Sequence, residues 1–191
     1  MSKVCYVLLA DGFEEVEALA PIDLLRRAGC TVYTVSMMPT RTVIGSHGIS
    51  VLADLCVAEL SANVTPDMLF LPGGMPGSKN LDNHPATTKL LEQAVKADAY
   101  IAAICAAPFV LGKRGLLAGK HATCYPGFDG DLQGATVEDA AVVADGKILT
   151  ASAMGAAEEL GLLMVAKLFD AETAEKICAA VHPRKQVLVN A

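Results

Sequence analysis

The chain has 191 residues, a length that fits one domain with a full-sized hydrophobic core, so we expect a single domain over 1–191. Hydrophobic residues make up 53% of the sequence and charged residues 19%, a balance that excludes a disordered protein. The 15 basic and 21 acidic residues give a net charge of −6 without a basic stripe, which argues against nucleic acid and anionic membranes as partners.

Short apolar runs alternate with segments of helical period, which is typical of a parallel sheet covered by helices on both faces. In chain order, the first half predicts a strand at 3–9, a helix at 14–28, a strand at 31–36, an antiparallel pair at 42–44 and 49–52, and a strand at 68–71. The second half predicts a helix at 85–97, a strand at 100–104, a helix from Pro108, a short strand in HATCYPG, strands at 140–144 and 147–150, and helices at 155–169 and 171–181. These elements predict a flavodoxin-like three-layer α/β fold with a mostly parallel central sheet.

Three local signals refine these elements. Gly29 is a typical residue just past the end of a helix. Pro21 lies inside the first helix and offers no N–H to the carbonyl of Glu17, so we expect a kink or a restart there. The pair Asp145-Gly146 between two strands is a strong hairpin signal.

The remaining bulk features concern location and metals. No apolar run reaches the roughly 18 residues that a membrane helix needs, and MSKVCYVLLADG is too short for a secretion signal, so we expect a cytoplasmic protein. The six cysteines show no C-x-x-C and no disulfide-like spacing, which indicates reduced thiols. The four histidines show no paired His/Cys spacing, and no phosphate-binding glycine motif occurs, so we expect neither a metal nor a cofactor.

In a flavodoxin-like fold, ligands bind outside the carboxyl ends of the strands. Four segments are predicted to lie at that edge of the sheet: 11–17, 72–77, 105–108 and 152–155. The functional site is therefore expected among them.

Cys105 stands where an apolar strand meets a predicted helix, within AYIAAICAAP. Free N–H groups and the helix dipole would stabilise a thiolate there, which predicts a lowered thiol pKa and a reactive sulfur. The small neighbours leave backbone N–H groups accessible and suit a sharp elbow. The alternative from position alone is a small buried hydrophobe like Cys5 or Cys178.

The segment ADGFEEVEAL places four acids at the start of the first helix, where the dipole alone accounts for them. Glu14 and Glu17 share one helix face, and one of them is expected to turn toward the sheet edge. A carboxyl group beside a thiolate would have a raised pKa and could shuttle a proton. Glu17 is the better candidate because Val16, Ala18 and Leu19 surround it.

The loop LPGGMPG follows a strand, and its paired glycines allow close backbone approach to a ligand. Its N–H groups could form an oxyanion hole, and a plain tight turn is the alternative.

Together, ADGFEEVE, LPGGMPG at 71–77 and AAICAAP at 102–108 resemble the ThiJ/PfpI superfamily, within it the branch that contains the parkinsonism-associated protein deglycase. The resemblance spans almost the whole chain, including PIDLLRRAG at 21–29 and KILTAS at 147–152. It implies a homodimer of flavodoxin-like subunits. It also implies that Cys105 is the nucleophile at the elbow, that a protonated Glu17 hydrogen-bonds its sulfur, and that the N–H groups of Gly73, Gly74 and Ala106 line an oxyanion pocket.

The chain departs from the family pattern at four positions. Tyr125 stands where many members have a histidine, so a local Cys-His pair is not available, and a phenol is a poor base at neutral pH. Ala107 replaces the histidine of the peptidase branch, which disfavours peptidase activity. Ser152 matches a family arginine and His47 another basic position, which weakens an anion-stabilising role there.

The residues and the resemblance together leave three functional hypotheses. The first is a glutathione-independent glyoxalase or deglycase that acts on a small 2-oxoaldehyde or its adducts through Cys105 and Glu17. The second is a redox sensor or chaperone in which oxidation of Cys105 is the event. The third is a binding protein with an inert thiol. The remaining pocket candidates are Glu14, Tyr125, Ser152 and His47.

Overall fold

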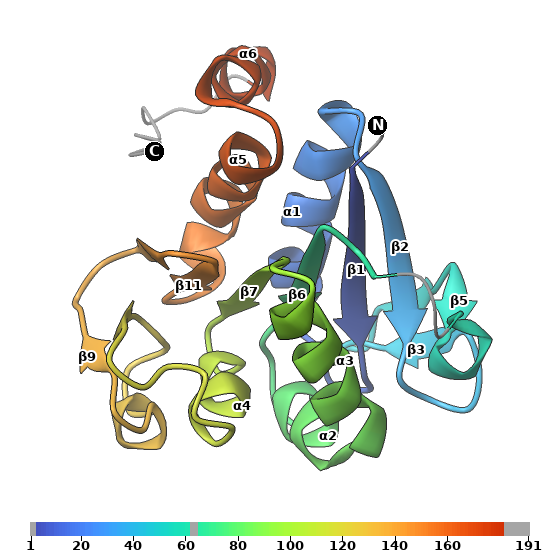
Figure 1. Ribbon diagram of the computed structural model, residues 1–191. Helices are drawn as coiled ribbons and strands as arrows, with labels where there is room; N and C mark the ends of the chain where they lie inside the picture. The colour runs from blue at the N-terminus through green and yellow to red at the C-terminus, as the bar shows by residue number, and fades with distance from the viewer. Residues whose placement is uncertain (1–2, 62–64, 182–191) are drawn as a thin grey trace.

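The computed structural model describes residues 3–61 and 65–181; residues 1–2, 62–64 and 182–191 of the predicted domain lie outside the described residues. A seven-stranded sheet in the order β10-β11-β7-β6-β1-β2-β5 forms the centre of the molecule (Figure 1). All neighbouring strands pair in parallel except β10 and β11. The strands are β1 (Val4–Leu9), β2 (Thr31–Ser36), β5 (Leu55–Cys56), β6 (Met68–Leu71), β7 (Tyr100–Ile104), β10 (Val142–Asp145) and β11 (Ile148–Ala151).

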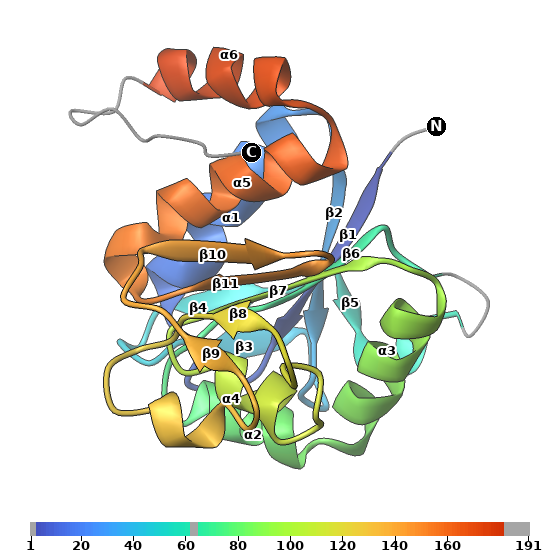
Figure 2. The ribbon, with the colours of Figure 1, turned by 60° about the vertical axis from the view of Figure 1, so that its left-hand side comes forward.

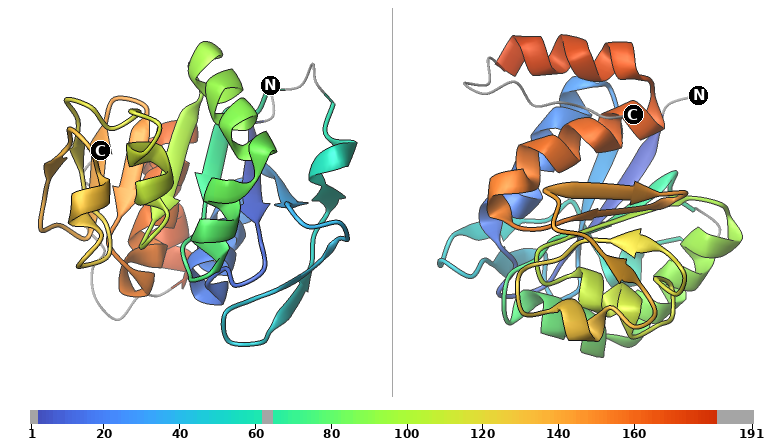
Figure 3. Two further views of the ribbon diagram at one scale, coloured as in Figure 1. Left: turned by 90° about the horizontal axis from the view of Figure 1, so that it is seen from below. Right: turned by 90° about the vertical axis from the view of Figure 1, so that its left-hand side faces the viewer.

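Helices cover both faces of this sheet (Figures 1 and 2). One face carries α1 (Glu15–Arg27) and α5 (Ala157–Leu168), with α6 (Ala171–Val181) packed on α5. The other carries α2 (Gly77–Asn83), α3 (Pro85–Lys96) and α4 (Pro108–Gly112). Alternate side chains of β1 enter the two cores, because successive residues of a strand point to opposite faces. Figure 3 shows the same layers from two further directions, and the three-layer prediction is confirmed.

Two small sheets flank the main one. The predicted antiparallel pair is β3 (Thr42–Ile44) with β4 (Ser50–Leu52), and β8 (His121–Ala122) is the strand predicted in HATCYPG. The predicted hairpin joins β10 to β11 through Gly146, whose φ of 61° is the left-handed conformation that such a turn requires. Short 3-10 helices lie at Val57–Glu59, Asp129–Asp131 and Met154–Ala156.

Of the kink or restart predicted at Pro21, the restart is wrong. Helix α1 is unbroken from Glu15 to Arg27, so no restart occurs. A Cβ on Gly161 of α5 would lie 3.0 Å from Pro21 Cα, which shows how closely the two helices pack at this point. Tertiary packing therefore holds the helix together although one backbone hydrogen bond is lost.

Three elements were not predicted: β5, α2 and β9 (Thr136–Val137). Helix α2 has the polar sequence GSKNLDN, in which Leu81 is the one large buried side chain. A seven-residue helix with a single buried large residue has no detectable period, and two-residue strands have none either.

The carboxyl ends of β1, β6, β7 and β11 lie side by side, because these strands are parallel neighbours in the sheet. The four segments expected at the ligand-binding edge follow these strands directly, so their predicted placement is confirmed.

Candidate functional site

Cys105 forms a strained elbow at the end of β7. Its φ is 62°, in the left-handed region that costs a residue with a side chain about 1–3 kcal/mol. Two backbone hydrogen bonds hold it there: its N–H donates to the Ala151 carbonyl at 2.8 Å, and its carbonyl accepts from the Tyr125 N–H at 2.8 Å. The sulfur is thus fixed at the sheet edge by backbone on both sides.

Glu17 is a buried acid, with only 1% of the residue exposed. Burial raises the pKa of its carboxyl group to about 7; the Glu14 charge adds to this, while the Cys105 thiol and the Gly73 N–H oppose it. Its Oε2 is buried without a hydrogen bond of good geometry. A buried carboxylate left in this condition is costly, so the site favours the protonated form of Glu17.

Burial also raises the pKa of the Cys105 thiol to about 12; the Glu17 charge and hydrogen bond add to the rise, and the N–H groups of Ala106 and Gly74 oppose it. The predicted lowering of the thiol pKa is therefore wrong. Helix α4, which was expected to cause it, has only five residues and begins at Pro108. Its dipole is too small to outweigh the removal of water from the sulfur.

Cys105 and Glu17 are in contact and titrate as a pair. A negative charge on either group raises the pKa of the other, so the pair holds two protons at low pH and shares one after the first has left. Once the first proton has left, the remaining one can reside on Glu17. A thiolate beside a protonated Glu17 would accept its hydrogen bond without facing a second negative charge.

The glycine loop brings its backbone against this pair. A Cβ on Gly73 would lie 2.7 Å from the Cβ of Cys105 and would also overlap Oε2 of Glu17. Gly74 has a φ of 89°, and its N–H interacts with the sulfur, as does that of Ala106. The Gly73 N–H interacts with Glu17 instead. The loop thus has room for backbone only, and two N–H groups face the sulfur.

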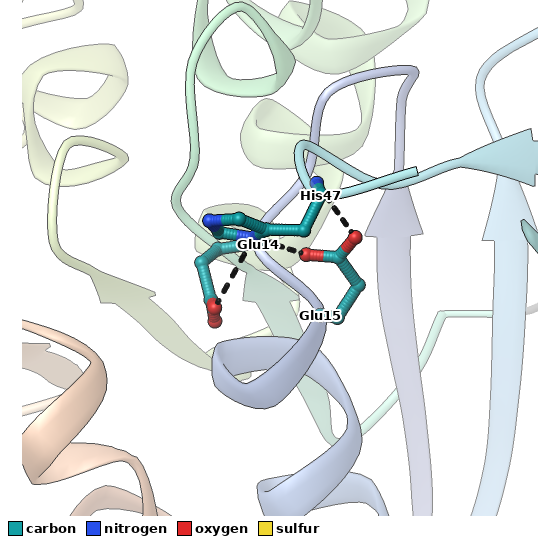
Figure 4. Close-up of side chains that lie close together, drawn as sticks. All are labelled: Glu14, Glu15 and His47. Carbon is teal, nitrogen blue, oxygen red and sulfur yellow. Dashed lines mark hydrogen bonds and ion pairs between the residues drawn. The ribbon is translucent and has the colours of Figure 1, made fainter. Parts of the chain in front are cut away.

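Glu14, Glu15 and His47 form a second cluster (Figure 4), which Oε2 of Glu14 connects to Glu17 by accepting the Glu17 N–H. Burial alone would raise the pKa of Glu15, but hydrogen bonds from the His47 side chain and from the N–H groups of His47 and Ile49 outweigh it and lower the pKa to about 2. The hydrogen bond and charge of Glu15, with a contribution from Glu14, raise the pKa of His47. Within 3–61 and 65–181 this is the one group of three such residues whose ligand atoms lie within 4.8 Å of one another. Because Glu15 is already satisfied by protein donors, we assign the cluster to ion pairing.

The structure places the other pocket candidates as follows. Tyr125 bonds to the elbow through its backbone, and its side chain is exposed. Ser152 follows Ala151, the residue that accepts the Cys105 N–H, and its own N–H donates to the Ala141 carbonyl at 2.9 Å. Both residues thus reach the site edge through the backbone that holds Cys105.

Glu15 was not predicted as part of the site. Its partners His47 and Ile49 lie more than thirty positions away in the chain. In the sequence it resembles any acid in the first turn of a helix, so no local signal could have distinguished it.

None of the helices within the described residues is both long enough and apolar enough to cross a membrane.

Comparison with known proteins places this site in context. A sequence profile of the DJ-1/PfpI family matches residues 3–167. Protein dj-1beta of Drosophila melanogaster is 35% identical over 179 residues, which cover 93% of this chain and 95% of that protein. Protein DJ-1 homolog B of Arabidopsis thaliana is 36% identical over 178 residues, 92% of this chain but 40% of the relative, so the chain spans less than half of that protein.

The fold comparison agrees. The structure of oxidized Toxoplasma gondii DJ-1 superposes with a TM-score of 0.92 and 34% identity, over 96% of this chain and 100% of that chain. The family resemblance drawn from the three sequence motifs is confirmed.

Proposed function

The chain belongs to the DJ-1/PfpI family, and on that premise we propose that it is a cysteine-dependent glyoxalase or deglycase, acting on 2-oxoaldehydes or on their adducts with thiols and amines. One observation carries the proposal: Cys105 is held in a strained elbow in contact with the buried acid Glu17, with the N–H groups of Gly74 and Ala106 facing its sulfur. A small aldehyde suits such a site because its chemistry needs a nucleophile, a proton shuttle and an oxyanion hole.

The reaction balances without a cofactor. The Cys105 thiolate adds to the aldehyde carbon, and the resulting alkoxide takes the Glu17 proton to give a hemithioacetal. The Glu17 carboxylate then removes the hydrogen from that carbon and returns it to the neighbouring one, while the hydroxyl proton passes from the first oxygen to the former ketone oxygen, which leaves a thioester of a 2-hydroxy acid. Water hydrolyses the thioester and restores the thiol. The Gly74 and Ala106 N–H groups would hold the oxygen charge in the first and last steps.

The direct test is the formation of lactate from methylglyoxal in buffer without glutathione. We expect lactate to accumulate with time and in proportion to protein. A yield no greater than in the protein-free control would contradict the proposed activity.

A second candidate function is redox sensing, with or without chaperone action. Two observations favour it: Cys105 is only half-buried, and the similar T. gondii structure is of an oxidized protein. Peroxide would convert the thiolate to sulfenate and then, with a second peroxide, to sulfinate, whose oxygens could accept the same N–H bonds.

Intact-mass measurement after mild peroxide treatment tests this candidate. Oxygen should add first at Cys105 and hardly at all to the Cys105→Ala variant. Simultaneous oxidation of all six thiols would argue against selective sensing, and a sulfur inert to both aldehyde and peroxide would leave the inert-thiol binding protein.

We also propose a homodimer. Helix α1 and the β3–β4 hairpin expose five large apolar side chains, and Glu15 ties the two elements together. A second copy of the chain would cover this surface. Sedimentation equilibrium should give twice the mass of the chain, and a single-chain mass at micromolar concentration would refute it. The apolar side chains are Val16, Leu19, Ile44, Ile49 and Leu52.

A further inference from the structure

His47 lies on the loop between β3 and β4, and its side chain is 71% exposed. Two contacts to one carboxylate nevertheless fix its position. The backbone N–H of His47 donates to Oε1 of Glu15 at 2.8 Å, and the ring Nδ1 lies 2.9 Å from Oε2 of the same residue. An exposed imidazole is thus anchored at both its backbone and its ring (Figure 4).

The anchor, Glu15, is itself held by several hydrogen bonds. Only 3% of Glu15 is exposed, and its oxygens accept two further bonds, from the Ile49 N–H at 3.3 Å and the Ser46 hydroxyl at 3.3 Å. These bonds keep Glu15 ionised despite its burial, so it faces the ring as a fixed negative charge.

Glu14 connects this anchored ring to the reactive pair. Its Oε1 lies 4.0 Å from His47 Nδ1, and its Oε2 accepts the Glu17 N–H at 2.6 Å. The charge of Glu14 acts on Glu17 and disfavours its ionisation. A cation held against Glu14 offsets that effect.

We propose that His47 is a positioning residue for the Glu17–Cys105 pair: anchored by Glu15, its imidazolium neutralises the Glu14 carboxylate and so favours loss of the first proton from the pair. The inference rests on the proposed role of that pair. It assigns a task to a residue that neither touches the sulfur nor is buried.

The charges around each group fix the sign of the effect. Glu14 and Glu15 face His47, whereas Glu14 and Cys105 face Glu17. With His47 protonated, the Glu14 charge is offset and the pair loses its first proton at lower pH. Loss of the His47 charge at higher pH, or by substitution, exposes Glu14 and moves that step to higher pH.

The rate of Cys105 alkylation by iodoacetamide, followed by peptide mass between about pH 5 and 9, tests the proposal because it reports thiolate directly. The midpoint is the pH at which the alkylation rate reaches half of its maximum. At low ionic strength, His47→Gln should move this midpoint up by about 0.3–0.5 pH unit, and Glu14→Gln should move it down by about as much. His47→Arg keeps a cation there and should stay within about 0.2 pH unit of the wild-type midpoint. At about 0.5 M salt the His47→Gln displacement should shrink by about half or more.

A matched control is available in His121→Gln. His121 is an exposed histidine with its own acid, its Nδ1 lying 2.6 Å from Glu138 Oε1. Its N–H donates to Asp145, which lies at the opposite end of the strands from Cys105. This variant should not move the midpoint.

The outcomes separate the two proposals. A wild-type profile with a clear midpoint that His47→Gln does not displace at low ionic strength overturns the role of His47 alone. Equal displacement in His47→Arg and His47→Gln also overturns it, since charge is then not the cause. A wild-type Cys105 that labels no faster than the buried thiols overturns both this role and the proposed function.

Discussion

The Cys105→Ser variant is expected to form lactate from methylglyoxal at least about 10³-fold more slowly than the wild-type chain. A hydroxyl group is a far weaker acid than a thiol, and Glu17 is too weak a base to ionise it in a buried site. The substitution therefore removes the nucleophile but keeps the shape of the elbow. Lactate formed per unit time in glutathione-free buffer is the measurement.

The matched control is Cys178→Ser, because Cys178 is a half-buried thiol on α6, away from the sheet edge. It should keep the wild-type rate within about 2-fold. If Cys105→Ser formed lactate as fast as the control, covalent catalysis by this sulfur would be refuted, whatever the wild-type rate.

The strands that position the site could be predicted because they are buried on both faces. The runs MLFL in β6 and YIAAI in β7 are almost wholly apolar, as central parallel strands are. Once the fold class was known, the strand ends had to meet at one edge, and the elbow and the glycine loop with them. The order of the strands along the chain and their apolar composition are therefore enough to predict that Cys105 lies beside the glycine loop.

The sequence prediction for Glu17 is correct in its placement but not in its physical reason. Its apolar neighbours Val16 and Leu19 suggested burial, yet both are exposed. Glu17 is buried because it lies on the α1 face that turns toward the sheet, with Ala18 beside it. On a helix, burial follows the period of the turn and not the identity of the adjacent residue.

Electrostatics could be predicted least well. The thiol pKa was expected to fall on the evidence of helix position, but desolvation dominates and depends on every neighbour that excludes water. The partnership of Glu15 with His47 depends on a hairpin folding back onto α1. Neither effect is encoded in any window of neighbouring residues.

The Glu17→Gln variant is expected to separate two roles of this acid. An amide cannot move a proton between carbons, so lactate formation should fall by about 10²–10⁴-fold. It can still donate a hydrogen bond to the sulfur, so Cys105 should remain open to alkylation. If the variant no longer forms lactate but Cys105 is still alkylated, proton transfer is assigned to Glu17.

The same variant should also gain stability relative to the wild-type chain as pH rises. The folded state raises the Glu17 pKa from its ordinary 4.5 to about 7, so the folded protein holds a proton that the unfolded chain has released. The free energy of unfolding of the wild type must therefore fall as pH rises between these values, by up to ~3 kcal/mol. The amide that replaces the carboxyl group cannot ionise, so the variant does not lose stability in this way, and it should gain this amount relative to wild type between about pH 5 and 8.

Urea unfolding at several pH values measures this difference. The folded state lowers the pKa of Glu15 to about 2, so the stabilisation that its ionised form provides is fully present above pH 4.5 and is lost only at lower pH. It is therefore the same in the variant and in the wild-type chain over this range. The control is Glu158→Gln, which replaces an exposed acid in the first turn of α5 by the same amide. If the difference for Glu17→Gln did not change with pH, Glu17 would ionise normally in the folded protein, and the proton it is proposed to carry to the substrate would not be there at neutral pH.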